Sequence, residues 1–290
     1  MNQYALVGSK GFIGNALASA MTARRLSLVK VESRGQLENL MAIPESFQNV
    51  DKVLWVASKV NPISAEMNPE LCDQELDVFS RFVSFLSSRG KSSVHLVFVS
   101  SAGCVYSGKE SIFLETSEAT GINAYGRLKY QMENILRNSK LSHSVLRVSN
   151  VYGPNQPIGR GQGVIAEWIS SINQRREVRV YGQLNSTRDY IFIDDLLEAI
   201  IAVAENAVNQ IFNIGSGTSS SLQDVISTLN TLTRLSFDVN YESPRPTDRG
   251  HFALDNSKIL RMTNWYPRYS LERGIEISLS SGISARSESS

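Results

Sequence analysis

The chain has 290 residues, 42% of them hydrophobic and 20% charged, as in a globular protein with one large core or two modest ones. Its 29 basic and 28 acidic residues nearly balance, so the net charge argues against nucleic acid or a membrane surface as a partner. Two cysteines, Cys72 and Cys104, are too few for a disulfide framework and fit a reducing compartment. With no signal-peptide pattern and no membrane-spanning apolar run, we expect a cytoplasmic protein.

Short apolar runs alternate with segments of helical periodicity through the first half of the chain. Continuous apolar runs are typical of strands that are buried on both faces of a parallel sheet. They lie at residues 4–7, 28–31, 53–57, 94–99 and 145–148. Apolar residues recur at helical spacing at residues 12–23 and 70–88. This alternation predicts an α/β fold with a Rossmann-type, doubly wound parallel sheet.

The second half is richer in glycine and proline and predicts a smaller C-terminal substrate lobe. We expect residues 1–152 and about 190–215 to form the dinucleotide-binding domain, and residues 153–189 and 216–279 to form the lobe. The two are interleaved because residues 191–204 have the pattern of another helix that covers the sheet. The serine-rich residues 280–290 are expected to be a disordered tail.

A glycine-rich segment, GSKGFIG at residues 8–14, follows the first expected strand and opens the first expected helix. Glycine permits a tight turn and a close backbone approach to a pyrophosphate, and the helix N-terminus offers N–H groups to that anion. A purely structural turn is the alternative, but the strand before it and the helix after it favour dinucleotide binding. The expected cofactor-binding residues here are Gly8, Lys10, Gly11, Phe12, Ile13 and Gly14.

The end of the second strand bears on the choice of cofactor. Glu32 would hold the adenosine ribose hydroxyls and exclude a 2′-phosphate, which favours NAD(H). Ser33 and Arg34, together with Lys10, would instead bind that phosphate. We expect NADP(H), because two cations converge on one place, and keep NAD(H) as the alternative.

Tyr125 and Lys129 lie one helical turn apart on the same face of an expected helix. A nearby cation lowers the pKa of a phenol, so the tyrosine can act as an acid or base near neutral pH. The alternative is a solvated helix face. The upstream strand favours a catalytic role for the pair. It ends in Ser100 and Ser101 at the carboxyl edge of the sheet, where ligands bind in such folds.

Together these segments resemble the extended short-chain dehydrogenase/reductase family, which contains nucleotide-sugar epimerases, dehydratases and reductases. The resemblance runs nearly end to end. It rests on the glycine loop, on residues 53–58 and 100–106, on Tyr125 with Lys129, and on residues 147–154, 188–195, 213–217, 245–248 and 254–258. It implies that Tyr125 donates or accepts the proton, that Lys129 lowers its pKa and holds the nicotinamide ribose, and that Ala57 contacts the cofactor.

The resemblance also implies that the substrate is a nucleotide-diphosphate sugar. It assigns Asn150, Arg188 and Arg245 to the diphosphate, a group that guanidinium forks suit. The alternatives are an ion pair with Asp189 or Asp194 for Arg188, and a solvated loop charge for Arg245.

Two further residues are expected to contact the substrate. Tyr181 is expected against the nucleotide base, with core packing as its alternative, and Asn123 is expected at the sugar. The three histidines show no ligand spacing, so we expect no metal.

One position departs from the family pattern. A serine or threonine usually stands four residues before the tyrosine of the Val-Tyr pair and polarises the sugar oxygen, but here that residue is Ala102. We expect Ser101 to replace it, since a hydroxyl donates better than the thiol of Cys104. Cys104 as a small buried hydrophobe is the alternative to a catalytic thiol.

Three functions compete. The first is an NADPH-dependent reductase of a 4-keto sugar nucleotide, the second an NAD-dependent 4-epimerase, and the third a non-catalytic dinucleotide-binding sensor. The intact Tyr125 and Lys129 argue against the sensor. Only 20 residues separate Glu32 from Val53, a short spacing similar to that of the GDP-fucose synthases, although residues 155–164 look more like the 4-epimerases. We expect the reductase.

The expected helix at residues 70–88 is apolar over more than one stripe. Phe79, Phe82, Val83 and Phe85 are too widely spread for one narrow face. Either the helix pairs with its copy in a homodimer or it is deeply buried against its own sheet.

Overall fold

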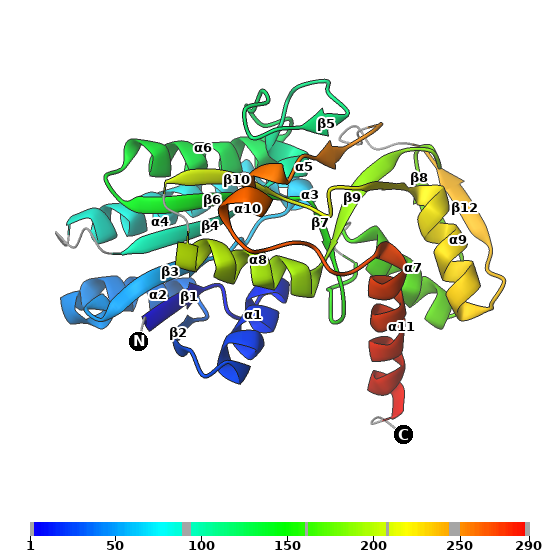
Figure 1. The fold of residues 1–290 in the computed structure, drawn as a ribbon, viewed down its shortest axis with the longest axis horizontal. Helices are drawn as coiled ribbons and strands as arrows, with labels where there is room; N and C mark the ends of the chain where they lie inside the picture. Colours follow the sequence, from blue (N-terminus) through cyan, green and yellow to red (C-terminus); the bar gives the residue numbers. More distant parts are fainter. Residues whose placement is uncertain (1–2, 89–93, 160–161, 207–208, 244–249, 288–290) are drawn as a thin grey trace.

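The computed structural model describes residues 3–88, 94–159, 162–206, 209–243 and 250–287. Its centre is a six-stranded parallel sheet in the order β10-β6-β4-β3-β1-β2, with helices on both faces (Figure 1). The predicted α/β fold with a Rossmann-type sheet is therefore confirmed. The strands are β1 (Gln3–Val7), β2 (Ser27–Val31), β3 (Val50–Trp55), β4 (His95–Ser101), β6 (Ser142–Val148) and β10 (Gln210–Ile214).

Alternate residues of the central strands point to opposite faces of the sheet, and both faces are buried. In β1, Leu6 packs in one core while its neighbours Ala5 and Val7 pack in the other. Strands covered on both sides are apolar at every position, which explains the continuous apolar runs in the sequence. One face is covered by α1 (Phe12–Ala23) and α8 (Ile193–Asn206), and the other by α2 (Arg34–Ala42), α4 (Pro69–Ser88) and α6 (Ala124–Asn138).

A smaller lobe lies beside the carboxyl edge of this sheet (Figure 1). It holds the sheet β11-β9-β7 and the pair β12–β8. Its elements are β7 (Asn150–Tyr152), α7 (Val164–Asn173), β8 (Val178–Tyr181), β9 (Thr187–Phe192), β11 (Ser219–Ser221), α9 (Leu222–Thr233), β12 (Val239–Glu242) and α11 (Leu271–Ser287). The short elements elsewhere are η1 (Pro44–Phe47), α3 (Pro62–Met67), α5 (Ala102–Val105), β5 (Ile112–Phe113), β13 (Ala253–Leu254) and α10 (Ser257–Met262).

The chain leaves the central sheet after β6 and returns to it as β10. Between these two neighbouring strands it builds β7, α7, β8 and β9 and then α8. The helix expected at residues 191–204 begins only at Ile193. Ile191 and Phe192 instead end β9, where they pair with Val151 and Tyr152 of β7, since branched and aromatic side chains suit a strand.

The last helix continues past the point where the sequence predicts disorder. Residues 280–287 belong to α11, and residues 288–290 lie outside the described part of the chain. The hydroxyls of Ser280 and Ser281 donate to the carbonyl oxygens of Glu276 and Ile277 one turn earlier, so the helix accommodates the serines. Within the described residues, no helix has both the length and the apolar character needed to span a membrane.

The apolar side chains of α4 are covered by the chain itself. Phe79 and Phe82 are buried against the central sheet. Phe85 packs on Phe47, with the two ring centroids 5.8 Å apart. The side chains that suggested pairing with a second copy therefore have partners within one molecule, and the homodimer through residues 70–88 stays a prediction.

Candidate active site

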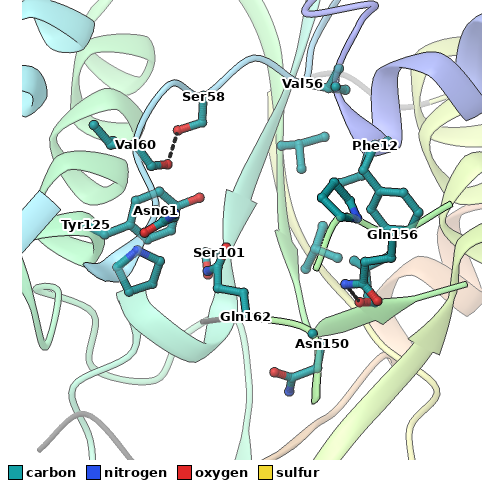
Figure 2. Close-up of a pocket in the computed structure, with 18 of the residues that line it drawn as sticks. Phe12, Val56, Ser58, Val60, Asn61, Ser101, Tyr125, Asn150, Gln156 and Gln162 are labelled. Carbon is teal, nitrogen blue, oxygen red and sulfur yellow. Dashed lines mark hydrogen bonds between the residues drawn. The ribbon is translucent and has the colours of Figure 1, made fainter. Parts of the chain in front are cut away.

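A cavity of about 1290 Å³ lies at the carboxyl edge of the central sheet. The segments after β1, β3, β4 and β6 form one wall, because parallel strands end at the same edge. Residues of α7, β8 and β9 form the opposite wall. Figure 2 shows Tyr125, Asn61 and Ser101 on one side of this cavity and Gln156 on the other.

The loop between β1 and α1 is shaped by glycines. Gly8 has φ +98°, and a Cβ there would lie 2.7 Å from the backbone of Ala57. A Cβ on Gly14 would lie 2.0 Å from the carbonyl oxygen of Gly8. Close backbone packing of this kind leaves room for no side chain at either position.

The same loop fits an anion. The N-terminus of α1 has no side-chain cap and no acidic residue in its first turn. The Oγ atom of Ser9 is buried and has no hydrogen-bond partner among the described residues. Free N–H groups and a buried hydroxyl suit the pyrophosphate of a dinucleotide. Of the expected cofactor residues, Gly8, Lys10, Gly11, Phe12, Ile13, Ser33, Arg34 and Ala57 line the cavity, whereas Gly14 supports the loop from beneath.

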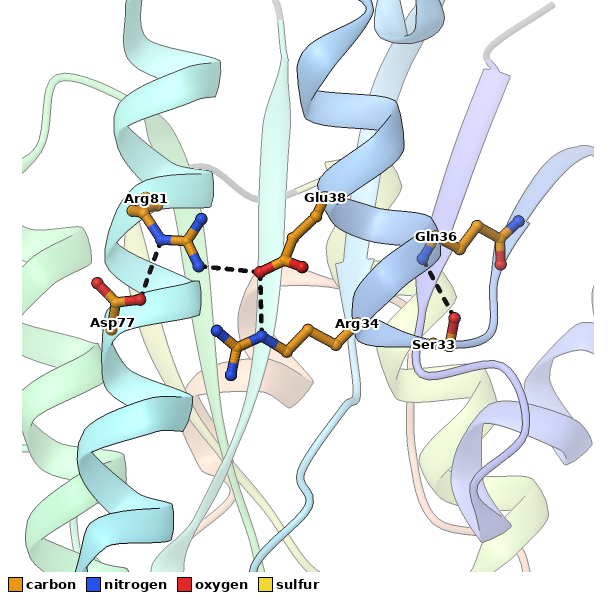
Figure 3. Close-up of polar contacts among 6 residues, drawn as sticks. All are labelled: Ser33, Arg34, Gln36, Glu38, Asp77 and Arg81. Atoms are coloured by element: carbon orange, nitrogen blue, oxygen red, sulfur yellow. Dashed lines mark hydrogen bonds and ion pairs between the residues drawn. The ribbon is translucent and has the colours of Figure 1, made fainter.

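At the end of the cavity formed by the glycine loop and the end of β2, the two cations expected to meet a 2′-phosphate each face a carboxylate. Lys10 Nζ lies 2.8 Å from Glu32 Oε2. Arg34 Nε lies 3.0 Å from Glu38 Oε1, which also pairs with Arg81 (Figure 3). This differs from the expected convergence of Lys10 and Arg34, because α2 begins at Arg34 and so places Glu38 one helical turn away.

Ser33 also has a local role at this end. Its Oγ accepts a hydrogen bond from the backbone N–H of Gln36 at 3.2 Å and so caps α2 (Figure 3). A phosphate at this place would therefore compete with the helix cap for the hydroxyl.

The N-terminus of α6 holds Tyr125 at the cavity. Asn123 caps the helix through a 2.7 Å hydrogen bond that its Oδ1 accepts from the N–H of Gly126, and its Nδ2 donates to Cys104 Sγ. Glu66 Oε1 of α3 accepts from the N–H of Ala124 at 2.7 Å. Asn123 is only 4% exposed and is not among the residues that line the cavity, and its expected contact with the sugar stays a prediction. Its position just before a helix was a capping signal in the sequence.

Glu75 of α4 is a site residue that the sequence analysis missed. Its Oε1 lies 3.6 Å from Lys129 Nζ, and the two side chains are only 9% and 2% exposed. The same carboxylate accepts hydrogen bonds from Ser58 Oγ at 2.8 Å and from the N–H of Lys59 at 2.7 Å. A charged residue within the apolar stripe of residues 70–88 was the signal for it.

The protonation of Tyr125 differs from the expectation that Lys129 lowers its pKa. Burial raises the pKa of Tyr125 far above its ordinary value, and the charges of Cys104 and Glu75 raise it further, whereas a hydrogen bond with Ser58 lowers it. Burial lowers the pKa of Lys129, and Glu75 opposes that effect. A raised pKa favours the protonated phenol of Tyr125.

The end of β4 presents Ser101 rather than Ala102 to the cavity. Ala102 is fully buried, whereas Ser101 and Cys104 line the cavity (Figure 2). Ser100, the other hydroxyl here, donates to Glu133 Oε1 at 2.6 Å within the core. The hydroxyl of Ser101 thus lies on the wall that also carries Tyr125.

The lobe supplies the opposite wall. Asn150, Tyr181 and Arg188 all line it, and their expected contacts with the nucleotide stay predictions. Arg188 Nη1 donates to the carbonyl oxygen of Thr187 at 2.9 Å. The alternative partner Asp189 is fully buried, where its carboxylate accepts from backbone N–H groups such as that of Ser216 at 2.7 Å.

Arg245, which is expected at the diphosphate, lies outside the described residues. Among those that are described, no group of three or more histidine, cysteine, aspartate or glutamate side chains is placed to hold a metal ion. Further residues of the lobe wall that the sequence analysis did not name are Gln156, Gln162, Trp168, Arg176 and Arg179.

Comparisons with known proteins agree with this architecture. The family described as "NAD dependent epimerase/dehydratase family" matches residues 4–215. A dTDP-4-dehydro-6-deoxyglucose reductase of Escherichia coli is 27% identical over 95% of this chain and 96% of its own length. A UDP-glucose 4-epimerase of Mycolicibacterium smegmatis is 26% identical over 93% of this chain and 95% of its own length.

Solved structures show the same fold. The UDP-glucose 4-epimerase of Thermotoga maritima with UDP-glucose superposes with a TM-score of 0.90 at 24% identity, over 99% of this chain and 100% of that one. The UDP-glucose 4-epimerase of Thermus thermophilus in complex with NAD has a TM-score of 0.86 at 21% identity, over 98% and 99%. The expected resemblance is confirmed: the chain is an enzyme of the NAD-dependent epimerase/dehydratase family, among the extended nucleotide-sugar epimerases, reductases and dehydratases.

Proposed function

We propose that this enzyme is a reductase of a 4-keto sugar linked to a nucleoside diphosphate. The observation that carries the proposal is the position of Tyr125, which lines the cavity on the same side as Ser101 and whose pKa burial raises. A tyrosine that keeps its proton at neutral pH suits an acid that donates to a carbonyl oxygen. The similarity to the E. coli reductase over 95% of the chain supports the same reaction class.

Each residue of the site has a separate role in the proposed reduction. The glycine loop and Lys129 would hold a nicotinamide cofactor, which would supply a hydride for the carbonyl carbon. Tyr125 donates its proton to the carbonyl oxygen, which becomes a hydroxyl, and then regains a proton from water in the cavity. Ser101 donates a hydrogen bond to the same oxygen while negative charge develops on it. Lys129 holds the nicotinamide ribose.

The lobe wall binds the nucleotide. Arg188 pairs with the diphosphate, Tyr181 packs on the base and Asn150 contacts the phosphates, with Arg245 as a further diphosphate ligand. We keep NADP(H) as the preferred cofactor, because Lys10 neutralises Glu32 at the adenosine end. NAD(H) remains the alternative, since Glu32 also suits free ribose hydroxyls.

The test is to mix the purified protein with NADPH or NADH and a dTDP- or UDP-linked 4-keto-6-deoxysugar. Loss of absorbance at the nicotinamide wavelength, with formation of the hydroxyl sugar, supports the reductase. Absence of oxidation with every such substrate contradicts it.

A 4-epimerase is the second candidate, because the mycobacterial epimerase is similar over nearly the whole chain. An epimerase keeps its dinucleotide between the oxidation and reduction steps. Mass spectrometry of nucleotide released from freshly purified protein separates the two: tightly held NAD favours the epimerase, and an empty site that binds NADPH favours the reductase.

A further inference from the structure

Glu75 is a largely buried acid on a helix face that also presents Gln74 and two apolar side chains to the cavity. Leu71 and Val78, one helical turn before and one after it, line the same cavity wall. Burying a carboxylate costs free energy unless other groups compensate its charge and its hydrogen-bonding capacity. Leucine or glutamine would fill this place without that cost, so the charge itself calls for an explanation.

The contacts of Glu75 join three separate pieces of the active site. Its carboxylate pairs with Lys129 Nζ of α6 and accepts hydrogen bonds from Ser58 Oγ and from the N–H of Lys59. Ser58 Oγ also lies 2.9 Å from the carbonyl oxygen of Val60, the other acceptor within reach of its single proton, and Figure 2 shows this turn beside Tyr125. One side chain of α4 thus holds both the cation of the site and the segment after β3.

We propose that Glu75 is a positioning residue, which fixes Lys129 Nζ at the cavity and holds the turn of residues 58–60 beside Tyr125. The inference rests on the proposed roles of Tyr125 and Lys129. Lys129 has three N–H donors, so it retains donors for the nicotinamide ribose while it pairs with Glu75. A lysine without this partner would lose both its orientation and the anion that favours its charged form.

The charge of Glu75 acts on a small set of titratable groups. Lys129 and Tyr125 face it from α6, Cys104 faces Tyr125 from α5, and Cys72 lies near Glu75 on α4. Lys59 contacts the carboxylate only through its backbone N–H. Removing the anion makes loss of a proton easier for both Lys129 and Tyr125. The alkaline limit of activity, where either group deprotonates, therefore moves to lower pH.

The experiment compares Glu75→Gln, which keeps the shape and removes the charge, with Asp73→Asn as a matched control. Asp73 is an exposed acid on the same helix and does not line the cavity. We expect Glu75→Gln to weaken NAD(P)H binding about tenfold in a fluorescence titration, as expected for a misplaced ribose ligand. We also expect the alkaline limb of the pH profile of kcat to shift to lower pH by about one unit or more. Asp73→Asn should match the unmodified enzyme in both.

A conservative variant keeps the test decisive if Glu75→Gln folds poorly. Glu75→Asp retains the charge on a shorter side chain, so it should weaken cofactor binding while keeping the alkaline limb within a few tenths of a pH unit. A lowered melting temperature with unchanged cofactor affinity and an unchanged limb would mean a purely structural role and overturn the inference. The cofactor titration needs no sugar, so it stands even if the enzyme proves not to be a reductase.

Discussion

The cavity carries a lysine paired with a glutamate at two places, and the two pairs differ in their surroundings. At the adenosine end, as we name the place where we propose that the adenosine binds, Lys10 and Glu32 lie 2.8 Å apart, with side chains 72% and 43% exposed. At the catalytic end, Lys129 and Glu75 lie 3.6 Å apart, with side chains 2% and 9% exposed. The closer pair is the more exposed one.

Distance alone therefore does not rank these two ion pairs. Water and salt screen the exposed pair, so it contributes little and yields readily when a ligand offers a better partner. Breaking the buried pair leaves a charge stranded in the interior, which is strongly unfavourable. We therefore expect the catalytic end to be rigid and sensitive to substitution, and the adenosine end to be tolerant.

The largest effect should come from Tyr125→Phe at the buried end. Removing the hydroxyl removes the proton donor, so kcat should fall by about a thousandfold or more while cofactor affinity stays nearly unchanged. Tyr130→Phe on the same helix is the control and should retain activity. If the Tyr125→Phe enzyme kept a tenth of normal turnover, Tyr125 would not be the proton donor.

Gly14→Ala should come next, through backbone packing. Its new Cβ would lie 2.0 Å from the Gly8 carbonyl oxygen, so the loop must shift, at a cost of about 1–3 kcal/mol in unfolding free energy. NADH and NADPH binding should weaken together. Gly35→Ala on α2 is the matched control, because a Cβ there meets nothing within 4 Å. Equal denaturation midpoints for the two variants would contradict the close packing.

Ser101→Ala should lower kcat by about ten- to a hundredfold with little change in KM, because the lost hydrogen bond matters most in the transition state. Cys104→Ala should have a smaller effect. If Cys104→Ala is the damaging change and Ser101→Ala is silent, the thiol holds this role. If neither changes kcat, Tyr125 acts without a partner.

The smallest effect is expected at the exposed end. The double variant Lys10→Ala, Arg34→Ala should weaken NADPH about tenfold more than NADH, because only NADPH offers a 2′-phosphate to these cations. The difference should shrink in high salt. Equal losses for both cofactors in a titration would show that neither cation discriminates between them.

Periodicity made the elements around the site predictable. The spacing of Tyr125 and Lys129 placed both on one helix face, and unbroken apolar runs identified the central strands, because both signals arise within short segments. Glu75 was not predictable as a partner of Lys129, since that contact depends on how α4 and α6 pack against each other. The pairing of Lys10 with Glu32 escaped prediction for a similar reason: it depends on side-chain conformations in a loop and a strand end.

The return of the chain as β10 has a consequence for biosynthesis. β10 pairs in parallel with β6, and a parallel pair needs a long crossover rather than a hairpin. During translation, the outer edge of β6 therefore stays open until residues 210–214 have emerged, and the sheet face that α8 covers stays exposed nearly as long. A chain that ended at residue 152 would have an unpaired strand edge and an apolar face covered only in part, by α1; such features recruit chaperones or lead to aggregation.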